Sequence, residues 1–107
     1  MKIESIRLPE MGDVVAGSGM PVFVSVKNTG DRKLENIHLS ATIPELGVRK
    51  RIGPFDVSVG ERESRTLLIE IPEWAEEGEY MIRFEFGNDD ARRIIHRPIQ
   101  IISEDEY

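Results

Sequence analysis

Apolar residues occupy every second position along much of this chain. In the run Val22-Phe23-Val24-Ser25-Val26-Lys27-Asn28-Thr29-Gly30, valines recur at alternate positions until a turn signal ends the run. Alternation of this kind is typical of a half-buried antiparallel strand, because successive side chains of a strand point to opposite faces of its sheet. The pattern returns in several later segments and predicts an all-β protein.

Turn signals divide the chain into about seven strand-like segments. The expected strands are Lys2–Leu8, Met20–Val26, Asn36–Ile43, Val48–Ile52, Arg65–Ile71, Tyr80–Phe86 and Ala91–Ile102. Short strands at this spacing predict an immunoglobulin-like antiparallel β-sandwich with Greek-key connections. We expect a single domain over residues 2–102 and an acidic tail or linker over residues 103–107.

Two parts of the pattern depart from simple alternation. Val48–Ile52 is short and basic, which predicts an edge strand, because lysine and arginine on an edge discourage pairing with other chains. A loop is then expected around Phe55 and Val57, over residues 53–60. Pro98 interrupts the last strand and predicts an edge position or a bulge there, since proline cannot donate to a ladder.

The order of the segments resembles a known family. The residues that carry the resemblance are Val26-Lys27-Asn28-Thr29-Gly30-Asp31, Ile43-Pro44, Val59-Gly60-Glu61, Leu67-Leu68-Ile69-Glu70-Ile71-Pro72 and Gly78-Glu79-Tyr80. Together they resemble the immunoglobulin-like modules of bacterial and archaeal cell-surface proteins, above all the cell-adhesion-related domain found in bacteria and the domains of archaeal S-layer-type proteins. The resemblance implies a non-enzymatic spacer or adhesion module, usually extracytoplasmic and often one of several in a longer protein.

Composition narrows the classes of partner. The chain has 107 residues, no cysteine, 14 basic and 20 acidic residues, and a formal net charge of −6. An acidic balance disfavours nucleic acid, whose binders need a net basic face. No segment reaches the roughly 20 apolar residues that span a bilayer, so we expect no direct membrane insertion. Met1-Lys2-Ile3-Glu4 lacks the apolar core of a signal peptide, which leaves a cytoplasmic protein or, as we favour, a domain of a longer surface or secreted chain.

The search for chemistry finds no catalytic, cofactor or metal site, and we expect no enzyme activity. His38 and His96 lack partners at the spacing of a metal or acid–base site and are expected to face solvent. Asn88-Asp89-Asp90 could offer oxygens to calcium but lacks the alternating carboxylates of a calcium loop, and an acidic turn explains it as well.

Two aromatic residues are given structural roles. Tyr80 opens a strand after a glycine bend, where sandwiches place a corner tyrosine whose hydroxyl bonds backbone a few residues upstream. Trp74 lies in a bend between Pro72 and Gly78 and is expected to be a core or end-cap residue. The alternative for Trp74 is an exposed aromatic that binds a ligand.

Function must then lie on surfaces. In an immunoglobulin-like order the first, second and fifth expected strands share a sheet, which would gather Ile3, Phe23 and Leu68 into an outward apolar patch for a neighbouring domain or a second copy. Scattered surface apolar residues are the alternative. A basic surface is expected from Arg83, Arg92, Arg93 and Arg97, close to Glu85 and His96. It either recognises an acidic surface or polysaccharide, or consists of solvated, paired charges.

The sequence therefore favours a structural or protein-interaction module of a larger surface or secreted prokaryotic protein. The alternative is an accessory domain that binds carbohydrate or peptide through Trp74 or the basic surface.

Overall fold

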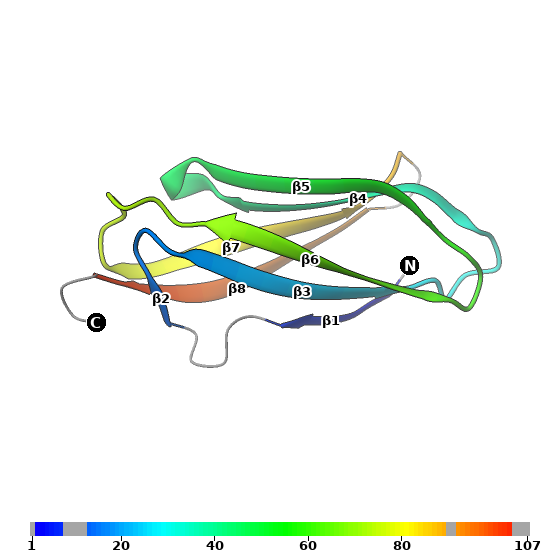
Figure 1. Ribbon diagram of the computed structural model, residues 1–107. Coiled ribbons are helices and arrows are strands. Elements are labelled where there is room, and N and C mark those ends of the chain that lie inside the picture. The colour runs from blue at the N-terminus through cyan, green and yellow to red at the C-terminus, as the bar shows by residue number, and fades with distance from the viewer. Residues whose placement is uncertain (1, 8–12, 90–91, 104–107) are drawn as a thin grey trace.

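The computed structural model describes the backbone of residues 2–7 and the complete residues 13–89 and 92–103 (Figure 1). The strands in these residues are β1 (Lys2–Arg7), β2 (Asp13–Val15), β3 (Gly19–Lys27), β4 (Leu34–Ile43), β5 (Val48–Val57), β6 (Arg62–Glu70), β7 (Gly78–Gly87) and β8 (Arg92–Ile102). A single 3₁₀ turn, η1 (Pro44–Leu46), joins β4 to β5. The expected acidic tail lies outside the described residues beyond Ser103.

The strands form two sheets that pack face to face. One sheet has the order β1-β3-β6 and the other the order β2-β8-β7-β4-β5. Among the described strands, β2 and β8 are parallel and the other neighbours are antiparallel. The first, second and fifth expected strands do share one sheet. The predicted immunoglobulin-like β-sandwich is therefore confirmed.

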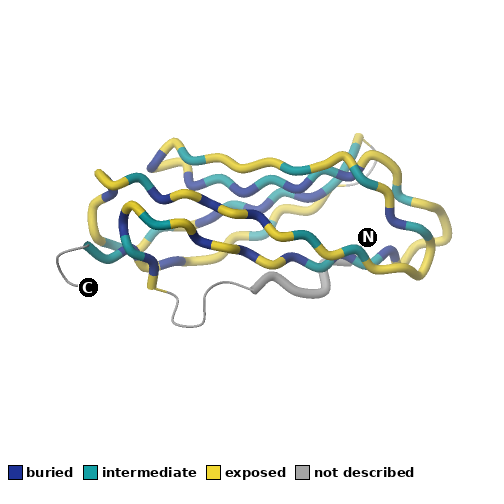
Figure 2. The backbone as a smooth tube through the Cα atoms, viewed as in Figure 1, coloured by how far each residue is buried: buried dark blue, intermediate teal, exposed yellow. Residues whose placement is uncertain are grey.

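The alternation in the sequence directs one side of each strand into the core, and Figure 2 shows buried and exposed positions following one another along the strands. The buried residues of the two sheets include Met20, Val22, Val24, Val26, Ile37, Leu39, Ala41, Ile43, Leu67, Ile69, Ile82, Phe84, Phe86, Ile99 and Ile101. The rings of Phe84 and Phe86 are stacked with centroids 6.3 Å apart. Burying a side chain of this size stabilises a fold by roughly 1.5–3 kcal/mol, so this core is its main support.

β1 begins and β8 ends at opposite ends of the sandwich (Figure 1). Lys2 pairs with Lys27, the last residue of β3. At the other end, Ile101 of β8 pairs with Gly78, the first residue of β7.

β8 is an edge strand over most of its length. β2 pairs only with Gln100–Ile102, so the outer side of β8 has no described partner before Gln100. Pro98 lies in that unpaired stretch, in agreement with the expected edge position, because a strand edge does not need the missing N–H. Ile95 packs against the core while Ile94 is 43% exposed.

β5 corrects the expectation of a loop around Phe55 and Val57. The strand continues to Val57, and only residues 58–61 form the turn to β6. Phe55 pairs with Ile37 and Ile52 pairs with Leu39, so β5 has one extra residue between these pairs and bulges. The interruption at Gly53-Pro54 is this bulge, at the edge of the sheet, where proline is tolerated.

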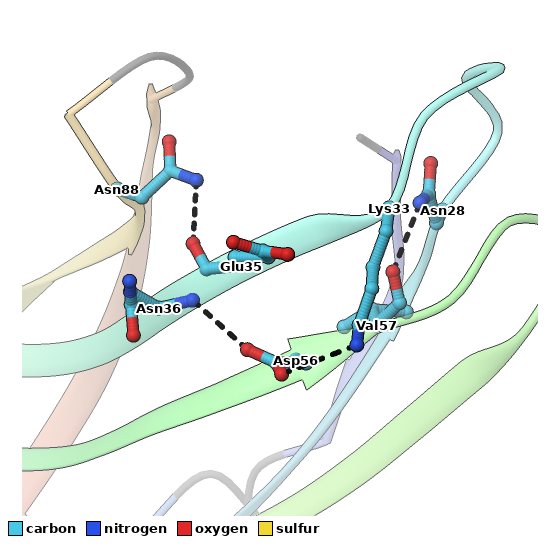
Figure 3. A network of polar contacts seen from close by, with 7 residues as sticks. All are labelled: Asn28, Lys33, Glu35, Asn36, Asp56, Val57 and Asn88. Carbon is cyan, nitrogen blue, oxygen red and sulfur yellow. Dashed lines mark hydrogen bonds and ion pairs between the residues drawn. The ribbon is translucent and has the colours of Figure 1, made fainter.

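Asn28 is a buried polar residue with 1% of its surface exposed. Its Nδ2 donates to the carbonyl oxygens of Arg32 at 2.7 Å and Val57 at 3.0 Å, and its Oδ1 accepts from the backbone N–H of Gly30 at 3.0 Å. Its own N–H donates to the carbonyl of Glu61. This side chain joins the β3–β4 turn to the end of β5, as Figure 3 shows in part, and satisfies every group it buries.

Candidate functional site

Outward residues of the five-stranded sheet form rows that cross its strands. Opposite residues on neighbouring strands face the same side of a sheet. One row holds Arg49, Thr42, Arg83 and His96, the next holds Arg51, Ser40, Glu85 and Ile94, and the third holds His38, Gly87 and Arg92. These positions face outward because Leu39, Ala41 and Ile43, which alternate with them on β4, are buried.

Four arginines dominate these rows, and we call them the arginine face: Arg49, Arg51, Arg83 and Arg92. Arg49, Arg51 and Arg92 line a depression of about 290 Å³ together with His38 and Ser40 of β4. Arg83 lies one row further along the sheet, opposite Thr42 and His96. Small-molecule sites usually measure about 300–1,000 Å³, so this depression lies at the lower end of their size range.

Positive charge exceeds negative charge on the arginine face. Glu85 forms ion pairs with Arg92 and, at 3.8 Å, with Arg83. Arg49 and Arg51 form no ion pair or hydrogen bond with side chains in the part of the chain that the structure describes. Two guanidinium groups are therefore available to an acidic ligand without breaking an existing contact.

A polar network ties β4 to its neighbours beside the depression, and its Asn88 lines the depression (Figure 3). Asn88, in the β7–β8 turn, donates from Nδ2 to the carbonyl oxygen of Glu35 on β4 at 2.7 Å. The N–H of Asn36, which has a left-handed φ of 57°, donates to Asp56 Oδ1 on β5 at 3.1 Å. Lys33 Nζ lies 3.5 Å from Asp56 Oδ2. These contacts tie β4 to both of its neighbours at this end of the sheet.

The structure divides the expected basic surface of Arg83, Arg92, Arg93 and Arg97 between two sides of the sheet. Arg93 is paired with Phe86 and Arg97 with Ile82, and both of these partners are buried on the core side. Arg93 and Arg97 are nevertheless exposed. Adjacent residues of a strand face opposite sides, so Arg83 and Arg92 belong to the outer side of the sheet and Arg93 and Arg97 to the other. A binding role for this basic surface stays a prediction.

Arg49 and Arg51 are the members of the arginine face whose basic strand was expected to protect a sheet edge. The spacing of two residues does place both side chains on one side of β5. Nothing in the sequence, however, shows that this side lies next to Arg83, which is more than thirty residues away and reaches it only through the register of β4.

The expected apolar patch is only partly described. Phe23 and Leu68 lie on the outer face of the three-stranded sheet and are 47% and 49% exposed. Their strands are neighbours, since Phe23 pairs with Thr66, two residues from Leu68. Ile3 is paired with Val26, and its side chain lies outside the described residues. A role for this patch in docking stays a prediction.

Trp74 corrects the expectation of a core or end-cap residue, because 68% of its surface is exposed. The bend around it is closed by the small residue Ala75, which is buried and whose N–H donates to the carbonyl of Pro72. Tyr80 Oη donates to the carbonyl oxygen of Glu76 at 2.7 Å. That bond fastens the bend to the start of β7.

The described residues, 13–89 and 92–103, contain no group of three or more histidine, aspartate or glutamate side chains that could hold a metal ion. His38 and His96 both face outward on the five-stranded sheet, at different rows. In the same part of the chain no helix has the length and apolar character needed to cross a bilayer.

Comparisons with solved structures show the fold. The chain is similar to the CARDB domain of a protein from Pyrococcus furiosus solved in complex with di-metal ions, with a TM-score of 0.60, 20% identity, and 92% of this chain and 90% of that chain covered. It is also similar to part of a family 123 glycoside hydrolase from Clostridium perfringens that hydrolyses glycolipid glycans, with a TM-score of 0.57 and 15% identity. That match covers 85% of this chain and 23% of the hydrolase. The expected resemblance to the cell-adhesion-related domain is confirmed.

A search of curated proteins found no match. The family model described as the NPCBM-associated, NEW3 domain of alpha-galactosidase matches residues 14–87, which run from β2 to the end of β7. This segment contains most of both sheets, including the valine-rich strand β3. The chain therefore belongs to the family of NPCBM-associated NEW3 domains.

Proposed function

We propose that the chain is a non-catalytic interaction module of a larger cell-surface or secreted prokaryotic protein, and that it binds an acidic partner through the arginine face. Domains of the NEW3 and CARDB types are accessory modules of larger proteins. The hydrolase match supports this arrangement, because a fold of this kind makes up under a quarter of that longer chain.

The excess of arginine over acid around the depression carries the proposal. Three arginines, Arg49, Arg51 and Arg92, line the depression with two carboxylates, those of Glu85 and Asp89. The whole chain, by contrast, carries a net charge of −6. A local positive patch on an acidic protein attracts acidic ligands. The planar guanidinium group binds a carboxylate, sulfate or phosphate with two parallel hydrogen bonds, which adds geometric selectivity to charge.

The test compares two double variants with the same change in charge. Arg49→Gln with Arg51→Gln neutralises the arginine face, and Arg93→Gln with Arg97→Gln neutralises the arginines that the register assigns to the other side of β8. Binding of polyglutamate and of oligogalacturonate is measured by isothermal titration calorimetry at two salt concentrations.

We expect the first variant to lose binding and the second to keep it. Because charge drives the association, the wild-type affinity should also fall as salt rises. Equal losses in the two variants would show that only net charge matters. If the wild-type protein binds neither polymer, the proposal is refuted.

A second candidate function is recognition of neutral carbohydrate by Trp74. Its support is the 68% exposure of the indole, next to Pro72 and Glu73, which line a depression with Gly17–Gly19 and Leu68. Trp74 is the only tryptophan in the chain, so intrinsic fluorescence reports on it alone. A panel of neutral oligosaccharides that changes neither the intensity nor the wavelength of its emission would exclude this function.

A further inference from the structure

We propose that the acidic partner is a protein segment, an extended acidic peptide that pairs with the free edge of β5 along Val48–Ile52. The inference rests on the proposed function and names the class of partner for the arginine face.

β5 offers an open edge at this stretch. It is the outermost strand of its sheet and pairs with β4 on one side only. The opposite side of Val48–Ile52 has no strand partner among the described residues, so its backbone N–H and C=O groups can pair with an added strand. The bulge at Gly53-Pro54 ends this stretch, because proline has no N–H to donate. Beyond the bulge, Phe55 already contacts Arg65 of β6. The open edge is therefore five residues long.

Basic side chains flank both faces of this edge. Arg49 and Arg51 project on the arginine face, and Lys50, opposite the buried Ala41, belongs to the other side yet is exposed. Residues directly opposite one another on paired strands have Cβ atoms about 4.5–5.5 Å apart, close enough for ion pairs. A partner strand with three consecutive acidic residues would set one carboxylate against each of the three basic residues.

Lys50 distinguishes a peptide ligand from a polysaccharide ligand, because only a peptide strand would contact it. An acidic glycan that lies on the outer face meets Arg49, Arg51 and the depression but has no reason to engage Lys50 on the other side. A strand that adds to the edge presents side chains to both faces in alternation, as β5 itself does. The charges of Arg49, Lys50 and Arg51, which lie on both faces, are therefore better matched by an added peptide strand than by a glycan.

The same charges select against other strands. Two β5 edges that paired with each other would bring like charges into opposition, which is unfavourable. A neutral strand would leave three basic residues without partners, whereas an acidic strand satisfies them. Basic residues on this edge thus disfavour pairing with basic or neutral strands and favour pairing with an acidic strand. Repulsion of wrong partners in this way contributes to specificity.

The experiment uses a synthetic peptide with the sequence Thr-Val-Glu-Asp-Glu-Val-Thr, blocked at both ends. Two further versions carry N-methyl groups, one on the amide of the central Asp and the other on the amides of the two Glu residues. Both keep the charge of the parent. Alternate amides of a strand point to opposite edges, so only one methylated version can block pairing with β5.

Binding is measured by NMR titration of ¹⁵N-labelled protein, with oligogalacturonate as the glycan probe. We expect the peptide to shift the amides of Val48–Ile52 and slow their hydrogen exchange, and one methylated version to bind about tenfold more weakly or worse. Lys50→Gln should lower the affinity for the peptide severalfold and leave the affinity for oligogalacturonate unchanged. Lys27→Gln, an equal change of charge on β3, is the matched control.

The outcomes separate this inference from the proposed function. If both methylated peptides bind as tightly as the parent, or if Lys50→Gln has no effect on the peptide, strand addition is wrong. Recognition of acidic ligands by the arginine face then still stands, provided that Arg49→Gln with Arg51→Gln abolishes binding. If neither the peptide nor the glycan binds the wild-type protein, both proposals fail.

Discussion

The guanidinium carbon of Arg65 lies 4.3 Å from the centre of the Phe55 ring, although the two residues belong to different sheets. Arg65 projects from β6 and Phe55 from the part of β5 that follows the bulge. The contact closes one open side of the sandwich, and Glu63 holds the guanidinium group from the same strand at 3.0 Å.

We expect Phe55 and Arg65 to be energetically coupled. A double-mutant cycle with Phe55→Leu and Arg65→Gln, followed by urea unfolding, should give a coupling free energy of about 0.5–1 kcal/mol, since the pair is partly exposed. A control cycle with Phe55→Leu and Arg49→Gln, six residues away on the same strand, should give coupling near zero. Equal coupling in both cycles would contradict a direct contact.

Asn28→Ala should destabilise the fold by about 2–4 kcal/mol, because it leaves the carbonyls of Arg32 and Val57 and the N–H of Gly30 without their partner. Thr29→Ala, at the exposed neighbouring position, should change the free energy of unfolding by no more than about 0.5 kcal/mol. Chemical denaturation followed by circular dichroism measures both values. Similar small losses in the two variants would show that the Asn28 side chain is not a structural tie.

Gly53 leaves little room for a side chain. It has a φ of +117°, and an added Cβ would lie 2.7 Å from the carbonyl oxygen of Ile37. Gly53→Ala should therefore cost more than about 2 kcal/mol of stability. Gly19→Ala is the control, because its Cβ would meet only the exposed, movable side chain of Leu68 at 3.1 Å, and it should cost less than about 1 kcal/mol. Thermal unfolding of both variants tests the bulge, and a reversed order of stability would contradict it.

Truncation to alanine should change the free energy of unfolding little at Trp74 and strongly at Phe84. Trp74→Ala removes a side chain from solvent and should alter the free energy of unfolding by no more than about 0.5 kcal/mol. Phe84→Ala opens a cavity between the two sheets and should lower the free energy of unfolding by about 3–5 kcal/mol. A large loss of stability on replacing Trp74 would instead support the packed end-cap that the sequence favoured.

The local alternation of side chains predicted most of the fold. Along β7 the period of two alone gave the buried Ile82, Phe84 and Phe86, because burial in a sandwich depends on which side of the strand a residue faces. The same rule failed at β5, where the bulge adds a residue and breaks the period. At Trp74 it gives no answer, because a bend has no period from which burial could be inferred.

The arginine face was less predictable than the core, for a physical reason. Placing Arg49 beside Arg83 requires the register of two strand pairs, both formed between segments far apart in sequence. That register cannot be inferred from the sequence of any single strand. Arg92 and Arg93 show the consequence, since a shift of one residue decides which of them joins the face.

The opposite placement of the start of β1 and the end of β8 has a mechanical consequence. In any longer polypeptide that contains this module, tension transmitted through it would run parallel to the strands. The ladders that join β1 to β3, and β8 to β7 and β2, would then be loaded in shear, so that their hydrogen bonds resist together instead of opening one at a time. The geometry suits a link that stretches little under load.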